Sequence, residues 1–121
     1  MKFTLETPTA VTIRSVSDAE IRIGEKRWSR TIALTAAGVL DGWAEKPIDS
    51  LVAEDFAVLL DTAPEMIVLG TGPAHVLPSR ELMFAFARRG VGFEVMDTRA
   101  AARTFNVLVG EGRQVAAVLY L

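Results

Sequence analysis

The sequence contains no cysteine and only one histidine, His75, among its 121 residues. The absence of cysteine excludes disulfides, thiolate zinc sites, iron–sulfur ligation and thiol nucleophiles, and it is typical of a reducing compartment. A single histidine with scattered carboxylates leaves few ligands from which to build a metal centre. We therefore expect no metal site, and a fold that is stabilised by packing alone.

Long apolar runs and basic tracts are also missing. No apolar stretch approaches the ~18 residues of a membrane span, and the N-terminus lacks the basic start and apolar core of a signal peptide. We expect a cytoplasmic protein without direct membrane insertion. Thirteen basic and fifteen acidic residues, mixed along the chain, give a net charge of −2. No tract could follow a phosphate backbone, so nucleic acid is not an expected partner.

The composition is that of a folded globular protein. Half of the residues are hydrophobic and 23% are charged, which supports a packed core and argues against disorder. A chain of this length is of ordinary size for one domain and buries roughly two-thirds of its surface on folding. We expect a single domain over residues 1–121, with residues 1–9 poorly ordered.

Two halves with different hydrophobic patterns indicate an α/β fold. Short alternating segments in the first half predict a small N-terminal antiparallel meander. From about residue 48 the pattern becomes helix, strand, helix, strand, helix, strand, which is typical of crossover connections. We therefore expect helix–strand repeats on a mixed, partly parallel central sheet. The predicted strands are 11–16, 21–23, 28–34, 66–69, 91–96 and 114–121, and the predicted helices are 50–61, 79–89 and 98–109.

A glycine-rich turn, Gly70-Thr71-Gly72, follows the predicted buried strand 66–69. Such a turn can bring backbone N–H groups close to an anion or phosphate. The turn does not match the dinucleotide fingerprint, because His75 stands where a third glycine is required and the helix begins only at Ser79. A phosphate-loop lysine is absent as well. We expect no nucleotide cofactor, and favour a structural turn over an anion site.

The helix 98–109 begins after Asp97 and carries Arg99 and Arg103 on one stripe with Asn106. Asp97 is interpreted first as the N-cap of this helix and second as a general base at the carboxyl ends of the strands. Arg99 in the first turn opposes the helix dipole, so we expect an ion pair with Asp97 or Glu94; a ligand site is the alternative. If the chain is an enzyme, Asp97, His75 and Thr71 are the only candidates for reacting groups.

The helix 79–89 carries an aromatic residue on its polar side. Its predicted core face is Leu82, Met83, Phe86 and Ala87, which leaves Phe84 beside Arg80 and Arg88. An exposed aromatic residue flanked by arginines is typical of a protein–protein interface, although a single exposed Phe is also common. Trp43, in a stretch with glycine before it, is a second candidate, with core packing as its alternative.

Three phrases of the sequence resemble a known family. They are Glu65–Gly72 (EMIVLGTG), Gly90–Thr98 (GVGFEVMDT) and the C-terminal pair Thr104–Leu108 (TFNVL) with Glu111–Ala117 (EGRQVAA). The chain is similar over residues 10–121 to the small family that includes the mitochondrial NADH dehydrogenase (respiratory complex I) assembly factor and the adipogenesis-associated domain protein. The resemblance implies a three-layer α/β fold and a role in assembly without an established enzymatic activity.

Two functions are therefore expected. The first is a non-enzymatic partner-binding or assembly protein, whose partner is a membrane respiratory complex under assembly and which docks through Trp43, Arg80, Phe84 and Arg88. The second is a small-ligand or anion-binding domain that uses the Gly70–Gly72 turn with Asp97, Arg99 and Arg103. The exposed apolar residues are also compatible with a homodimer.

Overall fold

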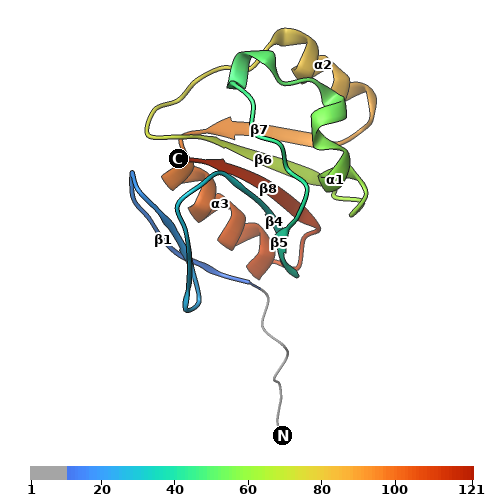
Figure 1. Cartoon of the computed structure of the whole chain (residues 1–121). Helices are drawn as coiled ribbons and strands as arrows, with labels where there is room; N and C mark the ends of the chain where they lie inside the picture. The colour runs from blue at the N-terminus through green and yellow to red at the C-terminus, as the bar shows by residue number, and fades with distance from the viewer. Residues whose placement is uncertain (1–10) are drawn as a thin grey trace, which may run out of the picture.

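The computed structural model describes residues 11–121, so the prediction for residues 1–9 lies outside the described residues. Its centre is a five-stranded sheet in the order β5-β4-β8-β6-β7 (Figure 1). β6 pairs with β7 and β8 in parallel, whereas β4 pairs antiparallel with β5 and β8. The predicted mixed, partly parallel sheet is therefore confirmed. The strands are β4 (Ile32–Thr35), β5 (Gly38–Leu40), β6 (Met66–Thr71), β7 (Gly92–Met96) and β8 (Val115–Tyr120).

The predicted meander is a separate three-stranded antiparallel sheet, β1-β2-β3. It consists of β1 (Ile13–Val16), β2 (Ile21–Ile23) and β3 (Lys26–Trp28). The segment 28–34, expected as one strand, is divided: β3 ends in the small sheet and β4 begins in the central one. Ile32 is fully buried in β4, whereas Arg30 in the link is exposed. The link carries the chain from one sheet to the other.

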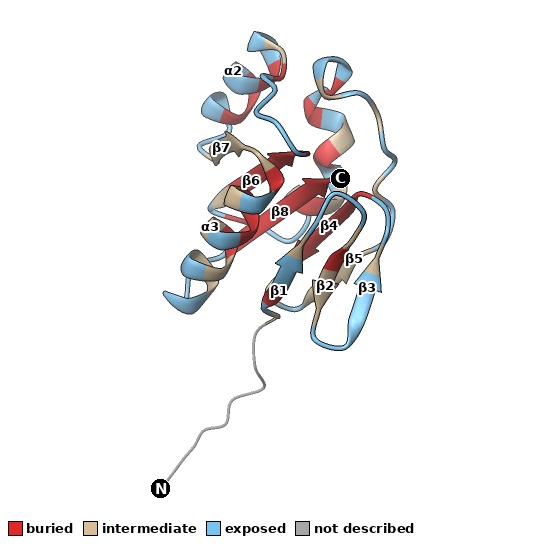
Figure 2. Cartoon of the chain, turned by 90° about the vertical axis from the view of Figure 1, so that its left-hand side faces the viewer, coloured by how far each residue is buried: buried red, intermediate tan, exposed pale blue. Residues whose placement is uncertain are grey.

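The central sheet is covered on both faces, which gives three layers. One face packs against α3 (Thr98–Gly110) and the small sheet, and the other against α1, α2 (Arg80–Arg88) and the preceding 3₁₀ turns. Alternate side chains of β6 point to opposite faces of the sheet. Val68 points to α3, while Ile67 and Leu69 point to the side of α1 and α2. β6 and β8 are buried along almost their whole length (Figure 2), as expected of strands covered on both sides.

The predicted helix 50–61 is wrong in its first half. The structure has two 3₁₀ turns, η2 (Ile48–Ser50) and η3 (Ala53–Phe56), followed by the short α1 (Ala57–Leu60). Leu51 and Val52 between the turns have extended backbones, and the Leu51 side chain is buried in the core. The Ser50 hydroxyl donates to the Pro47 carbonyl and caps no helix. Burial of Leu51 has overridden the local helical pattern.

The other two helices begin where the sequence predicts. The Ser79 hydroxyl accepts from the Leu82 N–H at 3.2 Å, and an Asp97 carboxylate oxygen accepts from the Ala100 N–H at 3.0 Å. The predicted N-cap Asp97 is thus confirmed, and Ser79, where the sequence predicts the start of a helix, is the N-cap of α2. Gly90 follows α2 with a φ of +70°, the left-handed conformation that glycine commonly adopts after the end of a helix.

The core face of α2 differs in part from the prediction. Leu82 and Phe86 are buried as expected, and Ala85 is buried with them. Met83 and Ala87, which were expected in the core, are exposed. The buried face of α2 is therefore narrower than its apolar sequence suggested. Leu82, Ala85 and Phe86 face the central sheet, and the other apolar residues of the helix point away from it.

Candidate functional site

The Gly70–Gly72 turn lies at the edge of the sheet where three parallel strands end. Thr71 of β6 is in register with Tyr120 of β8, and Gly70 is in register with Met96 of β7. In open α/β sheets this edge is the usual place for a ligand. A small pocket of about 50 Å³ opens here, which is far below the 300 Å³ or more of a typical small-molecule site. Gly72, Asp97, Arg99 and the turn Ser17-Asp18 contribute to its lining.

The polar groups of the turn are already used within the protein. The buried Thr98 hydroxyl accepts from the Gly72 N–H at 2.7 Å and donates to the Tyr120 carbonyl at 2.5 Å. The Thr98 N–H in turn donates to the Gly72 carbonyl at 2.9 Å. Thr98 therefore ties the turn, the last strand and the start of α3 together. Sequence reasoning missed this role, because Thr98 is 26 positions from Gly72 and 22 positions from Tyr120.

Gly70 allows α3 to approach β6 closely. A Cβ atom at residue 70 would lie 2.9 Å from both the Cα and the Oγ1 of Thr98, which is closer than a Cβ atom can approach them. Gly72 has a φ of +98°, a conformation that favours glycine. Both glycines are thus explained by packing and backbone geometry.

Thr71 stabilises the loop after β6. Its hydroxyl donates to the Ala74 carbonyl at 2.6 Å and accepts from the Val76 N–H at 3.1 Å. His75 is exposed in the same loop and does not line the pocket. The three groups considered for catalysis, Asp97, His75 and Thr71, are therefore not brought together at this pocket.

Arg99 does not form the expected ion pair. Neither Asp97 nor Glu94 lies within 4.0 Å of its guanidinium, and Arg99 Nε instead donates to the Val16 carbonyl at 3.2 Å. The prediction was wrong because the Asp97 carboxylate caps the helix, while the Arg99 side chain extends towards β1. Arg103 does not line the turn pocket and faces a separate groove between α3 and β1. The stripe that contains these arginines faces the small sheet.

The α2 candidates lie together on one exposed stripe. Phe84 is 55% exposed, and Arg80 and Arg88 lie one turn before and after it, both exposed. Among residues 11–121, neither arginine has a carboxylate within 4.0 Å. The structure therefore brings these three predicted residues together.

Trp43 packs into the protein. Its ring meets Phe56 edge to face with centroids 5.1 Å apart, and Phe56 contacts Phe86 and Phe93 in the same way. The Trp43 side chain is half-buried, and its indole N–H is buried with no hydrogen-bond partner among the described residues. Trp43 thus belongs to an aromatic cluster between η3, α2 and β7, and it does not share the α2 stripe. The sequence did not show this cluster, because its rings come from four separate segments.

Tyr120 closes the sheet on the side of Lys46. Its hydroxyl donates to the Lys46 carbonyl at 2.6 Å, and burial raises the pKa of Tyr120 to about 12. The phenol is therefore neutral at physiological pH and acts as a hydrogen-bond donor to the main chain.

The family follows from comparison with known proteins. A family model described as "Protein of unknown function (DUF498/DUF598)" matches residues 13–120. The chain belongs to this family. A 13 kDa major membrane protein of Francisella tularensis is 32% identical over 101 residues, which are 82% of this chain and 80% of that protein.

A second relative of this DUF498/DUF598 chain confirms the resemblance proposed from the sequence. NADH dehydrogenase (ubiquinone) 1 alpha subcomplex assembly factor 3 of Bos taurus is 31% identical over 116 residues, or 94% of this chain. The match spans only 62% of the bovine protein, which is therefore considerably longer than the shared region.

Solved structures confirm the fold of the DUF498/DUF598 chain. A Xanthomonas campestris protein solved by NMR has a TM-score of 0.84 at 30% identity and covers 99% of this chain and 92% of that one. A crystal structure from Bordetella parapertussis has the same TM-score at 32% identity, with coverages of 95% and 98%. The predicted three-layer α/β fold is thus shared with both.

Two further features bear on the chemistry of the DUF498/DUF598 chain. Within residues 11–121, no group of three or more His, Asp or Glu side chains is placed to hold a metal ion. Over the same residues, no helix is both long enough and apolar enough to cross a membrane.

Proposed function

We propose that this DUF498/DUF598 chain is a non-enzymatic partner-binding protein that acts in the assembly of a membrane respiratory complex. The name of the bovine relative supports this role, because the match covers 94% of the present chain. The partners of the longer bovine protein need not be shared, since the match spans 62% of its length. The cytoplasmic location expected from the sequence belongs to the same proposal.

The exposure of the Phe84 side chain is the observation that carries the proposal. A phenylalanine that is 55% exposed in the middle of α2 leaves a large apolar surface in water. Burial of that surface against a partner would be favourable, and aromatic and arginine side chains are enriched among the residues that dominate binding energy. Arg80 and Arg88, without carboxylate partners among the described residues, would meet acidic groups around the pocket that receives Phe84.

The experiment is affinity capture from intact membranes with the tagged full chain. We expect wild type to recover subunits of the respiratory NADH dehydrogenase, and Phe84→Asp to reduce that recovery at least tenfold. Val76→Asp is the matched control, because Val76 is 42% exposed and lies in the loop before α2, outside the α2 stripe. Equal recovery by wild type and Phe84→Asp would show that α2 is not the docking surface. Failure of wild type to recover any subunit of the dehydrogenase would remove the respiratory role.

A second candidate function is the binding of a small anion at the glycine turn. It is supported by the convergence of Gly72, Asp97 and Arg99 on one pocket at the carboxyl ends of the strands. Gly70, Thr71 and Arg103 do not line this pocket. A thermal-shift screen with phosphate, nucleotides and carboxylates is the test. A ligand at a hundred times its dissociation constant stabilises the fold by about 2.7 kcal/mol, so no shift with any of these anions would remove this candidate.

The homodimer also stays a prediction. Its test is the molecular mass in solution, measured by light scattering over a range of protein concentrations. A dimer that dissociates in Phe84→Asp would place the interface on α2, and a mass of 13.1 kDa at every concentration would exclude the dimer.

A further inference from the structure

An open groove runs along the contact between β1 and α3, on the side of the molecule away from α2 (Figure 1). Arg14 and Ser15 line it from β1, and Arg99, Arg103 and Asn106 line it from α3. Its volume is about 260 Å³, and all three arginines are exposed. The groove therefore gathers three guanidinium groups from two elements that are far apart in the sequence.

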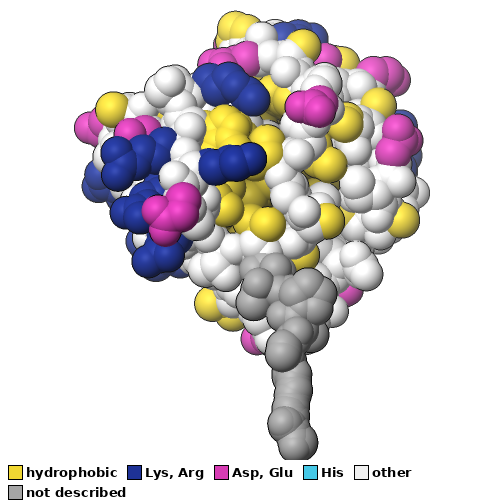
Figure 3. All heavy atoms as spheres, turned by 60° about the horizontal axis from the view of Figure 1, so that its bottom comes forward, with side chains coloured by type: hydrophobic (Ala, Val, Ile, Leu, Met, Phe, Trp, Pro, Cys, Tyr) yellow, Lys and Arg dark blue, Asp and Glu magenta, His cyan; other side chains and the backbone are white. Residues whose placement is uncertain are grey.

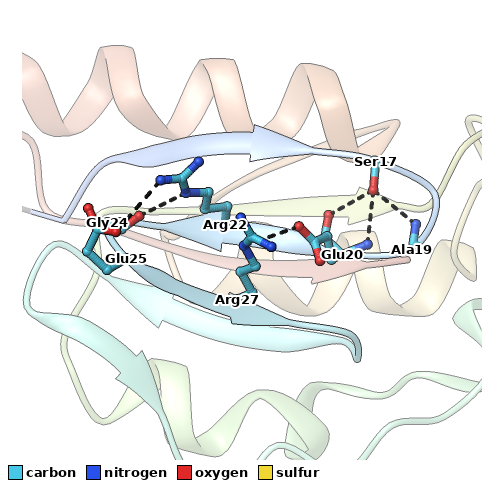
Figure 4. A network of polar contacts seen from close by, with 7 residues as sticks. All are labelled: Ser17, Ala19, Glu20, Arg22, Gly24, Glu25 and Arg27. Carbon is cyan, nitrogen blue, oxygen red and sulfur yellow. Dashed lines mark hydrogen bonds and ion pairs between the residues drawn. The ribbon is translucent and has the colours of Figure 1, made fainter.

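These three arginines have no carboxylate partner among the described residues. Arg22 and Arg27, which are near neighbours in the small sheet, do have partners: Arg22 lies 3.9 Å from Glu25, and Arg27 lies 3.6 Å from Glu20 (Figure 4). Within residues 11–121, no carboxylate lies within 4.0 Å of the arginines that line the groove. Their positive charge is thus not neutralised by any described acidic side chain.

The charge is also unevenly distributed across the molecule, contrary to the even mixing expected from the sequence. Lys and Arg side chains gather on the left of Figure 3, the side on which β1 lies in Figure 1, with fewer Asp and Glu side chains among them. Residues 41–65 carry seven acidic residues and one lysine, a net charge of −6. Most of this acidic segment covers the other face of the central sheet, with η2, η3 and α1. The protein therefore has a more basic side, which we call the basic side, and a more acidic side, which we call the acidic side.

An exposed apolar side chain continues the stripe of arginines on α3. Val107 is 58% exposed and lies one turn beyond Arg103, which lies one turn beyond Arg99. A hydrated soluble anion gains nothing from a neighbouring valine. At a bilayer surface, by contrast, apolar side chains enter the boundary of the acyl chains while arginines bind the headgroups.

We propose that the side formed by α3 and β1 docks on a bilayer surface that contains anionic phospholipids. Arg14, Arg99 and Arg103 bind phosphate oxygens of the headgroups, and Val107 enters the interface beside them. A lipid surface fits better than nucleic acid, because no aromatic side chain lines the groove to stack on bases. This docking leaves α2 free for a protein partner and does not depend on the proposed role of α2.

The acidic side of the protein does not prevent this docking. At about 0.1 M salt the Debye length is about 10 Å, so charges beyond that distance from the lipid are largely screened. The acidic segment lies beyond the central sheet, roughly 20 Å from the basic side if adjacent layers are about 10 Å apart. Each basic side chain near an anionic surface contributes about fivefold to binding. If the protein turned its acidic side to the lipid, the anionic surface would repel it, so the orientation with the basic side towards the lipid is favoured.

The experiment is co-sedimentation of the full chain with vesicles. We compare vesicles of phosphatidylcholine alone with vesicles of equal parts phosphatidylcholine and phosphatidylglycerol, at about 0.1 M and about 1 M salt. We expect wild type to bind only the anionic vesicles and to dissociate at the higher salt concentration. Equal sedimentation with both kinds of vesicle, or with neither, would overturn the proposal.

Variants of two residues without internal contacts locate the surface. We expect Arg14→Ala combined with Arg103→Ala to weaken binding about 25-fold, and Arg103→Ala alone about fivefold. Arg89→Ala, which removes the same charge from the end of α2, is the matched control and should bind as wild type does. Equal binding by all three variants would overturn the assignment to the groove. Unchanged melting temperatures verify that the variants are folded.

Val107→Ser distinguishes a bilayer from other anions, because it removes the apolar surface without adding a charge beside Arg103. It should reduce binding to anionic vesicles about tenfold and leave binding of soluble tripolyphosphate or single-stranded DNA unchanged. If a soluble anion binds through Arg103 and the vesicles do not, the groove is an anion site and the proposed bilayer docking is wrong. If Val107→Ser binds vesicles as wild type does, insertion of Val107 is wrong as well.

Discussion

The side-chain amide of Asn106 pairs with both main-chain polar groups of Ile13. The Ile13 N–H donates to Asn106 Oδ1 at 2.9 Å, and Asn106 Nδ2 donates to the Ile13 carbonyl at 2.9 Å. An asparagine side chain can supply one acceptor and two donors, so it satisfies the strand here as a neighbouring strand would. This pair joins the small sheet to α3 across 93 positions of sequence.

Asn106→Asp should loosen the small sheet. An aspartate can still accept from the Ile13 N–H, but it cannot donate to the Ile13 carbonyl and repels it instead. We expect a loss of about 1–3 kcal/mol in the free energy of unfolding, with faster hydrogen exchange in β1 and β2. Asn106→Gln, which keeps both kinds of group, is the comparison variant. Unchanged exchange in β1 would show that this pair does not anchor the sheet.

Gly70→Ala should be much more costly than an alanine at another glycine. The new methyl group would lie 2.9 Å from the Thr98 Cα, so the start of α3 must shift, and overpacking of this kind costs about 1–3 kcal/mol. Gly110→Ala is the matched control, because it has free space around it and lies in the last turn of α3. It should stabilise the protein by up to about 1 kcal/mol. Urea denaturation of both variants checks the prediction, and equal stabilities would contradict the close approach.

Thr98→Val should remove the link between the glycine turn and the last strand. The valine has nearly the same shape, but it leaves the Gly72 N–H and the Tyr120 carbonyl without their buried partner. At about 1–3 kcal/mol for each unsatisfied group, we expect a total loss of about 2–6 kcal/mol. Thr98→Ser keeps the hydroxyl and should cost much less. A thermal melt that ranks the two variants in the opposite order would refute this role of Thr98.

Asp55 should make stability depend on pH in the acid range. Partial burial raises its pKa, but the Val52 N–H and the Lys46 ammonium together outweigh burial, so that its pKa lies below the usual 3.8. The unfolded chain then binds this proton at higher pH than the folded protein does. The stabilisation from Asp55 is therefore fully present above about pH 5 and is lost as the pH falls through the lowered pKa.

The measurement compares wild type with Asp55→Asn by denaturant unfolding at about pH 7 and about pH 3. At the higher pH we expect wild type to be more stable than Asp55→Asn. At the lower pH we expect the difference in their free energies of unfolding to be smaller. The carboxylate lies 3.0 Å from Lys46 Nζ and 2.8 Å from the Val52 nitrogen, and asparagine weakens both contacts. A gap that is the same at both values would show that Asp55 does not titrate differently in the folded state.

The helices that could be predicted are those whose ends are fixed by nearby residues. Ser79 and Asp97 each accept from an N–H three residues ahead, a contact that needs no distant part of the chain. The segment after Pro47 could not be predicted in this way. Its apolar residues are spaced as in a helix, but the burial of Leu51 between two turns depends on the sheet beneath it.

The candidate sites divide in the same manner. The exposed stripe of Arg80, Phe84 and Arg88 follows from helical spacing alone, because residues four apart share one face. The environment of Arg99 does not follow from spacing. Its acceptor is the Val16 carbonyl, 83 positions away, and nothing near Arg99 in the sequence indicates it. The ion pair between Arg99 and Asp97 was expected because the two residues are close in sequence. The contact that Arg99 makes instead is with a distant part of the chain.

The sequence by itself determined the alternation of helix and strand in the second half, the partly parallel character of the sheet there, the starts of α2 and α3 and the exposed stripe on α2. Each depends on periodicity, chain reversal or a hydrogen bond within one turn, which neighbouring residues settle. Only the tertiary structure decided that Thr98 joins Gly72 to Tyr120, that Asn106 holds Ile13, and that three arginines without carboxylate partners border one groove. Those arrangements arise when strands from distant parts of the chain become neighbours, because burial and hydrogen bonding are satisfied by whichever groups the packed sheet brings together.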